Sequence, residues 1–183
     1  GDRVMFTATM PDNRWNIYEV KLDGTGHRML IENEEPDLEF YDGTYLPDGR
    51  MIATSNIGYQ GVPCVSGSDP VGNMVLYDPK TKNMRRLTFD QDANWNPVIM
   101  HNGRVMYTRW EYTDLTHYFS RFVMHMNPDG SDQKEYYGSN SYWPNSLFNA
   151  RPLPGRPGMF AGIVSGHHGV KRLGELVLFD VNR

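Results

Sequence analysis

The sequence predicts an all-β fold of four-stranded antiparallel sheets, and three observations support that prediction. A Gly-containing turn followed by an apolar strand recurs four times. The copies lie 47, 54 and 55 residues apart. Aromatic residues make up 13% of the chain beside 18 Gly and 12 Pro, and no helical periodicity of useful length is present. Self-similarity at a period near fifty, with strand and turn signals inside each copy, indicates a β-propeller. The copies read Gly1-Asp2-Arg3 with VMFTAT, Asp48-Gly49-Arg50 with MIATS, Asn102-Gly103-Arg104 with VMYTR, and Pro157-Gly158 with MFAGIVS.

Each copy expands into strands in which apolar and polar residues alternate, the pattern of half-buried strands. A complete copy has four strands joined in order, so it forms an antiparallel meander. The predicted strands are 3–10, 16–22 and 28–31 in the first copy; 43–47, 50–55, 73–78 and 85–89 in the second; 95–100, 104–109, 121–126 and 133–137 in the third; and 143–153, 159–165 and 175–181 in the fourth.

The number of copies leaves two architectures open. We count about three and a half to four blades over residues 1–183, which we expect to form a single domain. Closed propellers usually have four to eight blades. The chain is therefore either a small four-bladed ring or part of a larger propeller cut from a multidomain protein. The larger propeller is favoured, because an isolated arc leaves exposed sheet edges.

The meander sorts the connections into two faces, because every second connection lies at the same end of the strands. One face carries tight turns at Asp23-Gly24, Asp48-Gly49, Asn102-Gly103 and Asp129-Gly130, where two-residue hairpins would need positive φ at both central positions. The opposite, loop-rich face gathers connections 10–15, 32–42, 56–72, 90–94, 110–120, 138–142 and 166–174. Long loops on a rigid scaffold usually carry function. This face holds Cys64, Trp110, Glu111, Asp114, His117, His167 and His168.

Charge and motif content exclude several classes of function. The net charge is −4 and the longest basic run is Arg85-Arg86, so the electrostatic footprint of a nucleic-acid partner is absent. No apolar stretch approaches the ~20 residues of a membrane span. The sequence has no CxxCH for covalent haem, no HExxH, no P-loop and no GxSxG elbow.

A metal site is one interpretation of the single cysteine and the paired histidines. His167 and His168 stand in the loop SGHHG, where adjacent imidazoles can reach one ion. Zinc would need two further ligands, for which Cys64 and acidic loop residues are the sources. The alternatives are a buried, unreactive Cys64 and histidines hydrogen-bonded within their own loop.

A ligand surface is predicted where the third copy enters its long loop. Trp110 begins this loop and is a candidate for stacking on a ligand, and Glu111, Asp114 and His117 follow it. The acidic stretch 32–37, together with Asp90 and Asp92, either binds a hard cation or forms a solvated rim, and the rim is favoured because calcium-loop spacing is absent. Trp95 and Trp143 begin equivalent strands and are expected to pack between blades.

The repeats resemble the TolB-like or WD40-like propeller repeat, which joins a PDG turn, an IAFTS-like strand, an IYxMNxDG strand and an RLT strand. The matching pieces are Pro47-Asp48-Gly49-Arg50 with MIATS, Ile17-Tyr18 with Leu22-Asp23-Gly24, Asn127-Pro128-Asp129-Gly130, and Arg86-Leu87-Thr88. The resemblance covers nearly the whole chain. It implies architecture and leaves function open.

Three segments, QGVPC, the stretch 94–112 and SGHHG, resemble the middle propeller domain of proteins related to the hydrazine synthase α subunit. That resemblance implies a periplasmic or otherwise exported protein in which the propeller adjoins domains that can carry c-type haems. It further implies that Cys64 and the two histidines could meet a metal ion or a haem from a neighbouring domain.

Taken together, the sequence favours a non-catalytic propeller module of a larger exported protein that scaffolds a redox, metal or ligand site on its loop-rich face. No complete catalytic set is present, although the parent protein could be an oxidoreductase. Its expected partners are neighbouring domains of the same polypeptide and other protein subunits. A metal-dependent propeller enzyme acting on a carbohydrate or peptide, and a protein-interaction ring, remain open alternatives.

Overall fold

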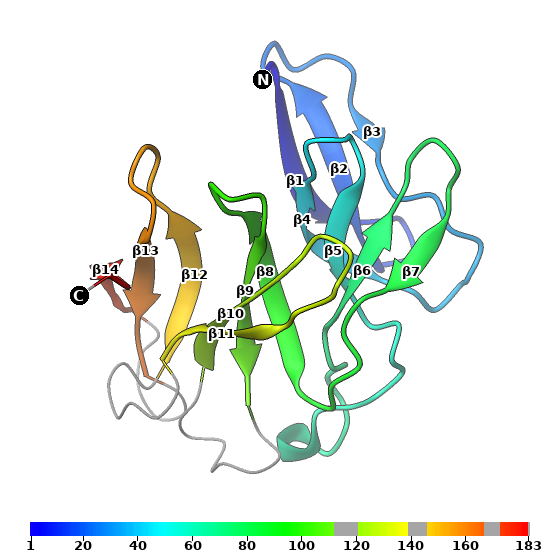
Figure 1. Cartoon of the computed structure of the whole chain (residues 1–183). Helices are drawn as coiled ribbons and strands as arrows, with labels where there is room; N and C mark the ends of the chain where they lie inside the picture. The colour runs from blue at the N-terminus through cyan, green and yellow to red at the C-terminus, as the bar shows by residue number, and fades with distance from the viewer. Residues whose placement is uncertain (112–120, 139–145, 167–172, 183) are drawn as a thin grey trace. The chain divides into compact units, whose positions relative to one another are not determined.

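The computed structural model describes residues 1–111, 121–138, 146–166 and 173–182 and divides into two compact units, Gly1–Phe89 and Asp90–Arg183 (Figure 1). Among the described residues, the regular elements are β-strands apart from the 3-10 helix η1 (Pro63–Val65). The strands form four separate antiparallel sheets, each a meander in chain order. The predicted all-β, blade-like fold class is therefore confirmed.

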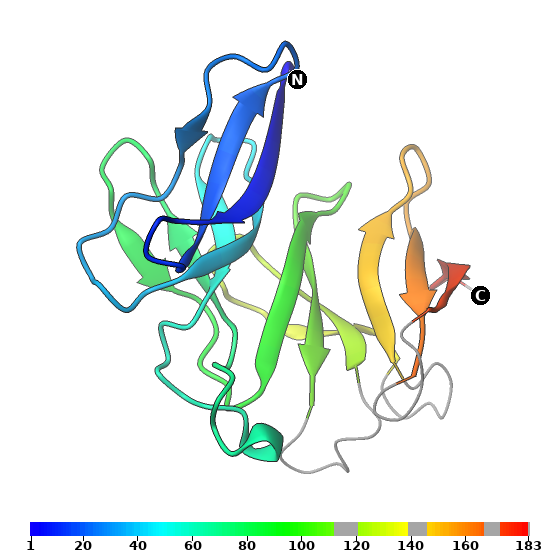
Figure 2. The ribbon, with the colours of Figure 1, turned by 180° about the vertical axis from the view of Figure 1, so that it is seen from behind.

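The first unit contains a three-stranded and a four-stranded sheet. In both, strand order follows chain order, β1-β2-β3 and β4-β5-β6-β7. Strands β1 and β2 both contact β4, so the two sheets pack face to face near that strand (Figure 2). The strands are β1 (Arg3–Thr9), β2 (Trp15–Lys21), β3 (Arg28–Met29), β4 (Phe40–Tyr45), β5 (Met51–Ser55), β6 (Asn73–Tyr77) and β7 (Met84–Arg86).

The second unit repeats this plan with one four-stranded and one three-stranded sheet. The orders are β11-β10-β9-β8 and β12-β13-β14. The strands are β8 (Ala93–Ile99), β9 (Val105–Trp110), β10 (Arg121–Met126), β11 (Lys134–Tyr137), β12 (Leu147–Pro152), β13 (Met159–Val164) and β14 (Glu175–Asp180). The predicted strands match these bounds closely, apart from late starts predicted for β4 and β8, and the predicted start at 143 lies outside the described residues.

The tight Gly turns differ from the predicted two-residue hairpins. The Leu46 carbonyl accepts the Gly49 N–H at 3.0 Å, and the Leu46 N–H donates to the Arg50 carbonyl at 2.8 Å. Only Gly49 takes a positive φ, +90°, while the Asp48 carboxylate accepts the Arg50 N–H at 3.0 Å. The Asn102-Gly103 turn repeats these bonds. A type I turn followed by a left-handed Gly explains the difference, because it needs positive φ at one residue only.

A β-bulge recurs in the first strand of three sheets and was not anticipated from the sequence. In β4, β8 and β12 the register shifts next to an Asp or Asn with φ between 51° and 54°. Asp and Asn tolerate this left-handed conformation better than other residues with side chains. Bulges bend a strand and re-aim its side chains. The aromatic–Asx pairs at these bulges are Tyr41-Asp42, Trp95-Asn96 and Phe148-Asn149.

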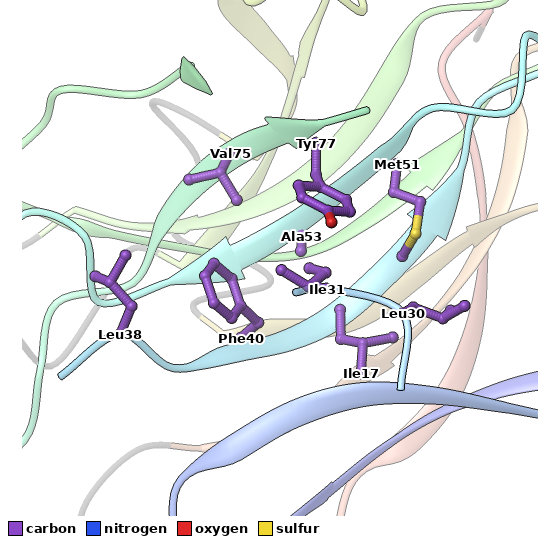
Figure 3. Close-up of a cluster of buried hydrophobic side chains, with 9 residues drawn as sticks. All are labelled: Ile17, Leu30, Ile31, Leu38, Phe40, Met51, Ala53, Val75 and Tyr77. Atoms are coloured by element: carbon purple, nitrogen blue, oxygen red, sulfur yellow. The ribbon is translucent and has the colours of Figure 1, made fainter. Parts of the chain in front are cut away.

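The core of the first unit lies where the strands of its two sheets face one another. Phe40 of β4, Met51 of β5 and Ile17 of β2 are fully buried there (Figure 3). Complete burial of each such side chain contributes about 1.5–3 kcal/mol. The whole cluster is Ile17, Leu30, Ile31, Leu38, Phe40, Met51, Ala53, Val75 and Tyr77.

The core of the second unit is built around two stacked phenylalanines. The ring centroids of Phe160 and Phe179 lie 4.8 Å apart with the planes inclined by 10°, and Tyr137 packs edge-on against both rings. Offset or edge-to-face aromatic pairs add about 0.5–1.5 kcal/mol beyond area burial. This cluster joins β12–β14 to β10 and β11.

One carboxylate, Glu19 of β2, lies inside the first unit. It is 1% exposed and accepts hydrogen bonds from Arg3 Nη1 at 2.8 Å, Arg28 Nε at 2.7 Å and the Tyr45 hydroxyl at 2.6 Å. Burial by itself raises the pKa of a carboxyl. The bonds from Tyr45 and Arg28 outweigh burial here, and the pKa of Glu19 lies below its usual value. Glu19 is therefore a fully partnered ion.

Candidate functional site

A polar site lies where β8 begins and β9 ends, at the loop-rich end of the second unit. Ala93 pairs with Trp110 and Asn94 with Arg109. This register places Asp92, just before β8, opposite Glu111, just after β9. The antiparallel ladder therefore brings together residues from two segments that are separated by about twenty positions in sequence.

The first half of the site is a neutralised ion pair. Arg109 donates from Nη2 to Asp90 Oδ2 at 2.5 Å and from Nε to Asn94 Oδ1 at 3.0 Å. Asn94 is fully buried and donates to Asp90 Oδ2 at 3.2 Å. The guanidinium is thus directed at Asp90 and held by the side-chain amide of Asn94, so the charge of Arg109 is matched first by Asp90.

The second half is the carboxyl pair of Glu111 and Asp92. Burial, the hydrogen bond to Asp92 and the negative charge of Asp92 together raise the pKa of Glu111 to about 7, against a lowering effect of Arg109. Asp92 is only 7% exposed. Glu111 therefore keeps its proton to a higher pH than an ordinary glutamate, because its ionisation would place a second negative charge beside Asp92.

An aromatic and cationic stack lies on the other face of the same strands, because side chains alternate along β9 and Trp110 follows Arg109. The Trp110 ring lies 6.0 Å from the Trp95 ring, and the Arg121 guanidinium carbon lies 4.4 Å from the Trp110 centroid. Arg121 also lies 5.3 Å from the Phe148 ring. Trp110 is 6% exposed, so its ring is packed within the second unit. Its stacking on a ligand stays a prediction.

The structure describes only some of the predicted site residues and brings two of them together. Trp110 and Glu111 lie together, next to Asp92. Cys64 belongs to η1 in the first unit, and its side chain is outside what the structure describes. Asp114, His117, His167, His168 and Trp143 fall outside the described residues. Within the described ranges, no group of three or more His, Cys, Asp or Glu side chains is arranged to hold a metal ion.

The prediction of a solvated acidic rim is correct for the stretch 32–37 and wrong for Asp92. In the stretch 32–37, Glu32, Glu34, Glu35 and Asp37 are exposed, as predicted. Asp92 is not a rim residue, because the β8–β9 register buries it against Glu111. Sequence reasoning also missed Asn94 and Arg109. The signal that could have identified them is the antiparallel pairing of the two predicted strands. This pairing places residue 92 opposite 111 and residue 94 opposite 109, and all four residues are polar.

Comparison with known proteins gives a match in structure but not in sequence. No family model and no curated protein sequence matches the chain. Hydrazine synthase from Kuenenia stuttgartiensis superposes with a TM-score of 0.77 at 11% identity, over 99% of this chain and 30% of that one. TolB from Acinetobacter baumannii superposes with a TM-score of 0.63 at 13% identity, over 99% of this chain and 39% of that one.

An oligogalacturonate lyase in complex with manganese superposes with a TM-score of 0.55 at 14% identity, over 99% of this chain and 47% of that one. This chain thus spans less than half the length of each of these three structures. At such identities the similarity shows the fold alone. Among the described residues, no helix is long and apolar enough to cross a membrane. The sheets, their meander order and these superpositions establish that the chain has a TolB-like β-propeller fold.

Proposed function

We propose that this chain is a non-catalytic propeller module of a larger exported protein and that it scaffolds a ligand site at the loop-rich end of its second unit. The observation that carries the proposal is the β8–β9 register, which places Glu111 opposite the buried Asp92, where the pKa of Glu111 is raised to about 7. The two residues flank the paired ends of β8 and β9, beside the ion pair of Arg109 and Asp90. Strongly perturbed pKa values of this kind cluster at functional sites.

The chemistry of the pair favours a cationic ligand. Near neutral pH Glu111 is partly protonated beside Asp92, and a divalent cation would displace this proton and bind an oxygen of each carboxylate. Hard divalent ions prefer oxygen ligands of this type. The manganese complex of a protein with the same fold makes Mn²⁺ a reasonable probe. Further ligands would come from the loops that follow Glu111, which include Asp114 and His117.

Titration of the whole chain with Mn²⁺, followed by electron paramagnetic resonance, tests this proposal. One ion should bind per chain at pH 8, and binding should weaken at least tenfold at pH 5, where protons compete for the pair. Glu111→Gln should abolish binding at both pH values. Glu175→Gln, which removes an exposed glutamate from β14 of the same unit, is the matched control and should bind as the parent does.

Mn²⁺ affinity that is the same at both pH values, or unchanged in Glu111→Gln, would remove the carboxyl pair as the site. Zinc analysis of the purified chain addresses the other metal set, Cys64 with His167 and His168. Stoichiometric zinc that is lost in His168→Ala would support that set.

A second candidate is a metal-dependent propeller enzyme acting on a carbohydrate or peptide. The raised pKa of Glu111 favours it, because a carboxyl that is half protonated near neutral pH is suited to general acid catalysis. Turnover of an oligosaccharide or peptide by the isolated chain, lost in Glu111→Gln, would replace the non-catalytic proposal by this one. Binding of a neighbouring domain without turnover would support the module.

A further inference from the structure

A small cavity of about 70 Å³ lies in the second unit beside the tight turn between β8 and β9, at the opposite end of these strands from Glu111 and Asp92. Sites for small organic molecules measure about 300–1,000 Å³. This cavity can hold a few waters or one ion. Three methionines and one histidine stand in its wall, and among the described residues that line it none is acidic. The lining includes Met100, His101, Met106, Tyr136, Pro157 and Met159.

The β8–β9 hairpin carries two of the methionines on one face. Met106 pairs with Val98, and the Met100 N–H donates to the Arg104 carbonyl at 2.8 Å, which extends the same antiparallel ladder. Because side chains alternate along a strand, Met100 and Met106 project from the same face of the sheet. They are 8% and 1% exposed and belong to the core cluster that includes Phe160 of β13. Both side chains are therefore confined between this hairpin and the sheet of β12, β13 and β14.

The β12–β13 hairpin brings the third methionine to the same place. The Leu153 N–H donates to the Met159 carbonyl at 3.0 Å, and the Leu153 carbonyl accepts a hydrogen bond from His101 Nε2 at 2.6 Å. Leu153 thus joins the histidine of one hairpin to the methionine of the next. Met159 is half-buried, and both it and His101 line the cavity. The four side chains are therefore gathered by backbone hydrogen bonds and core packing before any ligand arrives, which lowers the entropic cost of binding.

The hydrogen bond of His101 fixes which ring nitrogen can bind a ligand. A carbonyl oxygen has no proton to donate, so Nε2 carries the proton and Nδ1 of the neutral ring keeps a lone pair. Within the described part of the chain, no hydrogen bond to this Nδ1 is present. Histidines that bind metals usually donate the other ring N–H to a carbonyl or carboxylate in this way, which orients the ring. His101 is also exposed to solvent, so an ion can reach it from outside.

We propose that this cavity binds one copper(I) ion through the three methionine sulfurs and Nδ1 of His101. Thioether ligands select Cu(I) and imidazole suits copper, whereas Ca²⁺, Mg²⁺ and Mn²⁺ prefer oxygen ligands. The described lining offers no carboxylate, which favours a monovalent ion, because the free-energy cost of burying an ion rises with its charge. Methionine and histidine also ligate haem, but a cavity of about 70 Å³ is too small to admit a porphyrin.

Silver(I) titration of the whole chain, followed by nuclear magnetic resonance of 13C-labelled methionine methyl groups, tests the proposal with an ion that resembles Cu(I) and resists oxidation. Cys64, the one cysteine of the chain, is replaced by serine throughout, because its thiolate would compete for the same ion. One equivalent of Ag(I) should shift the methyl signals of the three cavity methionines together and leave that of Met51, in the first unit, in place. Cu(I) added without oxygen should move the same three signals.

Met159→Leu and His101→Gln are the sharpest variants. Leucine fills the space of methionine at small cost to stability and removes only the sulfur. Glutamine can still donate a hydrogen bond to the Leu153 carbonyl but has no imidazole nitrogen. Each change should weaken Ag(I) binding at least about tenfold, while the other methyl signals show that the chain is folded. Met84→Leu, at a half-buried position of the first unit, is the matched control and should leave affinity unchanged.

Cavity methyl signals that stay in place up to about 1 mM Ag(I) overturn the proposal. Equal Ag(I) affinity in the parent, Met159→Leu and His101→Gln also overturns it, since the methionines would then only fill space. Zn²⁺ that moves the three signals as strongly as Ag(I) would contradict the selection of a soft monovalent ion. None of these results bears on Mn²⁺ binding at Glu111, which lies at the other end of the strands.

Discussion

Glu19 in the first unit and Glu111 in the second show what surroundings do to the same side chain. Glu19 is 1% exposed, faces two arginines and a tyrosine hydroxyl, and its pKa lies below the usual value. Glu111 lies at a strand end, faces another carboxyl, and its pKa is raised to about 7. The more deeply buried glutamate is the ionised one. Partners, more than depth, decide whether a carboxylate stabilises the fold or is kept for a proton or a ligand.

The largest effect expected from this comparison is the loss of Glu19. Glu19→Ala leaves Arg3, Arg28 and Tyr45 without their shared acceptor and should destabilise the first unit by about 2–4 kcal/mol. Glu111→Ala relieves the contact between two acids and should change stability by less than about 1 kcal/mol. Urea unfolding monitored by 19F resonance of 5-fluorotryptophan separates the units, because Trp15 alone reports on the first. Equal losses of stability in Glu19→Ala and Glu111→Ala would contradict the proposed difference between the two glutamates.

Two tyrosines, one in each unit, give a second comparison with smaller expected losses of stability. The Tyr45 hydroxyl donates to the Glu19 carboxylate at 2.6 Å, whereas the Tyr107 hydroxyl donates to Gln133 Oε1 at 3.4 Å. Short bonds to an ion are worth more than long neutral ones. Tyr45→Phe should therefore cost about 1 kcal/mol, moderated by the 39% exposure of Tyr45, and Tyr107→Phe less than that. A larger loss for Tyr107→Phe would contradict this reasoning.

The two glutamates should also give the units opposite pH dependence. The stabilisation from Glu19 is present above the ordinary carboxyl pKa of 4.5 and is lost as the pH falls through its lowered pKa. The pKa of Glu111 is raised in the folded chain, so its stabilisation is present below 4.5 and is lost as the pH rises to about 7. Between these values the stability of the second unit should fall with rising pH.

Glu111→Gln should remove that fall and leave the pH profile of Trp15 unaltered. The matched control is Glu175→Gln, which should keep both profiles. A second unit whose urea midpoint is flat from pH 4.5 to 7 in the parent chain would mean that Glu111 titrates as an ordinary carboxyl.

The sequence predicted the fold far better than the site, and the reason lies in which interactions are periodic. Turn residues such as Gly49 and Gly103 recur with the repeat, so the blades could be predicted from one sequence. The Glu111–Asp92 pair depends on the β8–β9 register, and a register is set by packing across strands. The bulges were harder to predict than the turns, because the pairs Tyr41-Asp42 and Trp95-Asn96 recur but are not distinguishable from ordinary strand residues.

The smallest expected effects concern exposed ion pairs, one in each unit. Lys82 pairs with Glu32 in the first unit, with the two side chains 61% and 58% exposed. Lys134 pairs with Asp132 in the second, at 56% and 50% exposure. Such pairs are screened by water and salt and lose side-chain entropy when they form. Lys82→Met and Lys134→Met should leave the urea midpoint of their units unchanged within error, at low and at high salt.

Arg104 is the matched contrast for Lys134, because both side chains contact Asp132. The Arg104 guanidinium is only 15% exposed and donates to Asn127 Oδ1 at 2.7 Å, Asp132 Oδ2 at 2.9 Å and His125 Nδ1 at 3.0 Å. Arg104→Met removes all of these bonds at once and should lower the urea midpoint of the second unit clearly. If Lys134→Met lowered it as much, charge alone would govern these pairs, and the number of buried hydrogen bonds would no longer explain why Glu19 stabilises its unit.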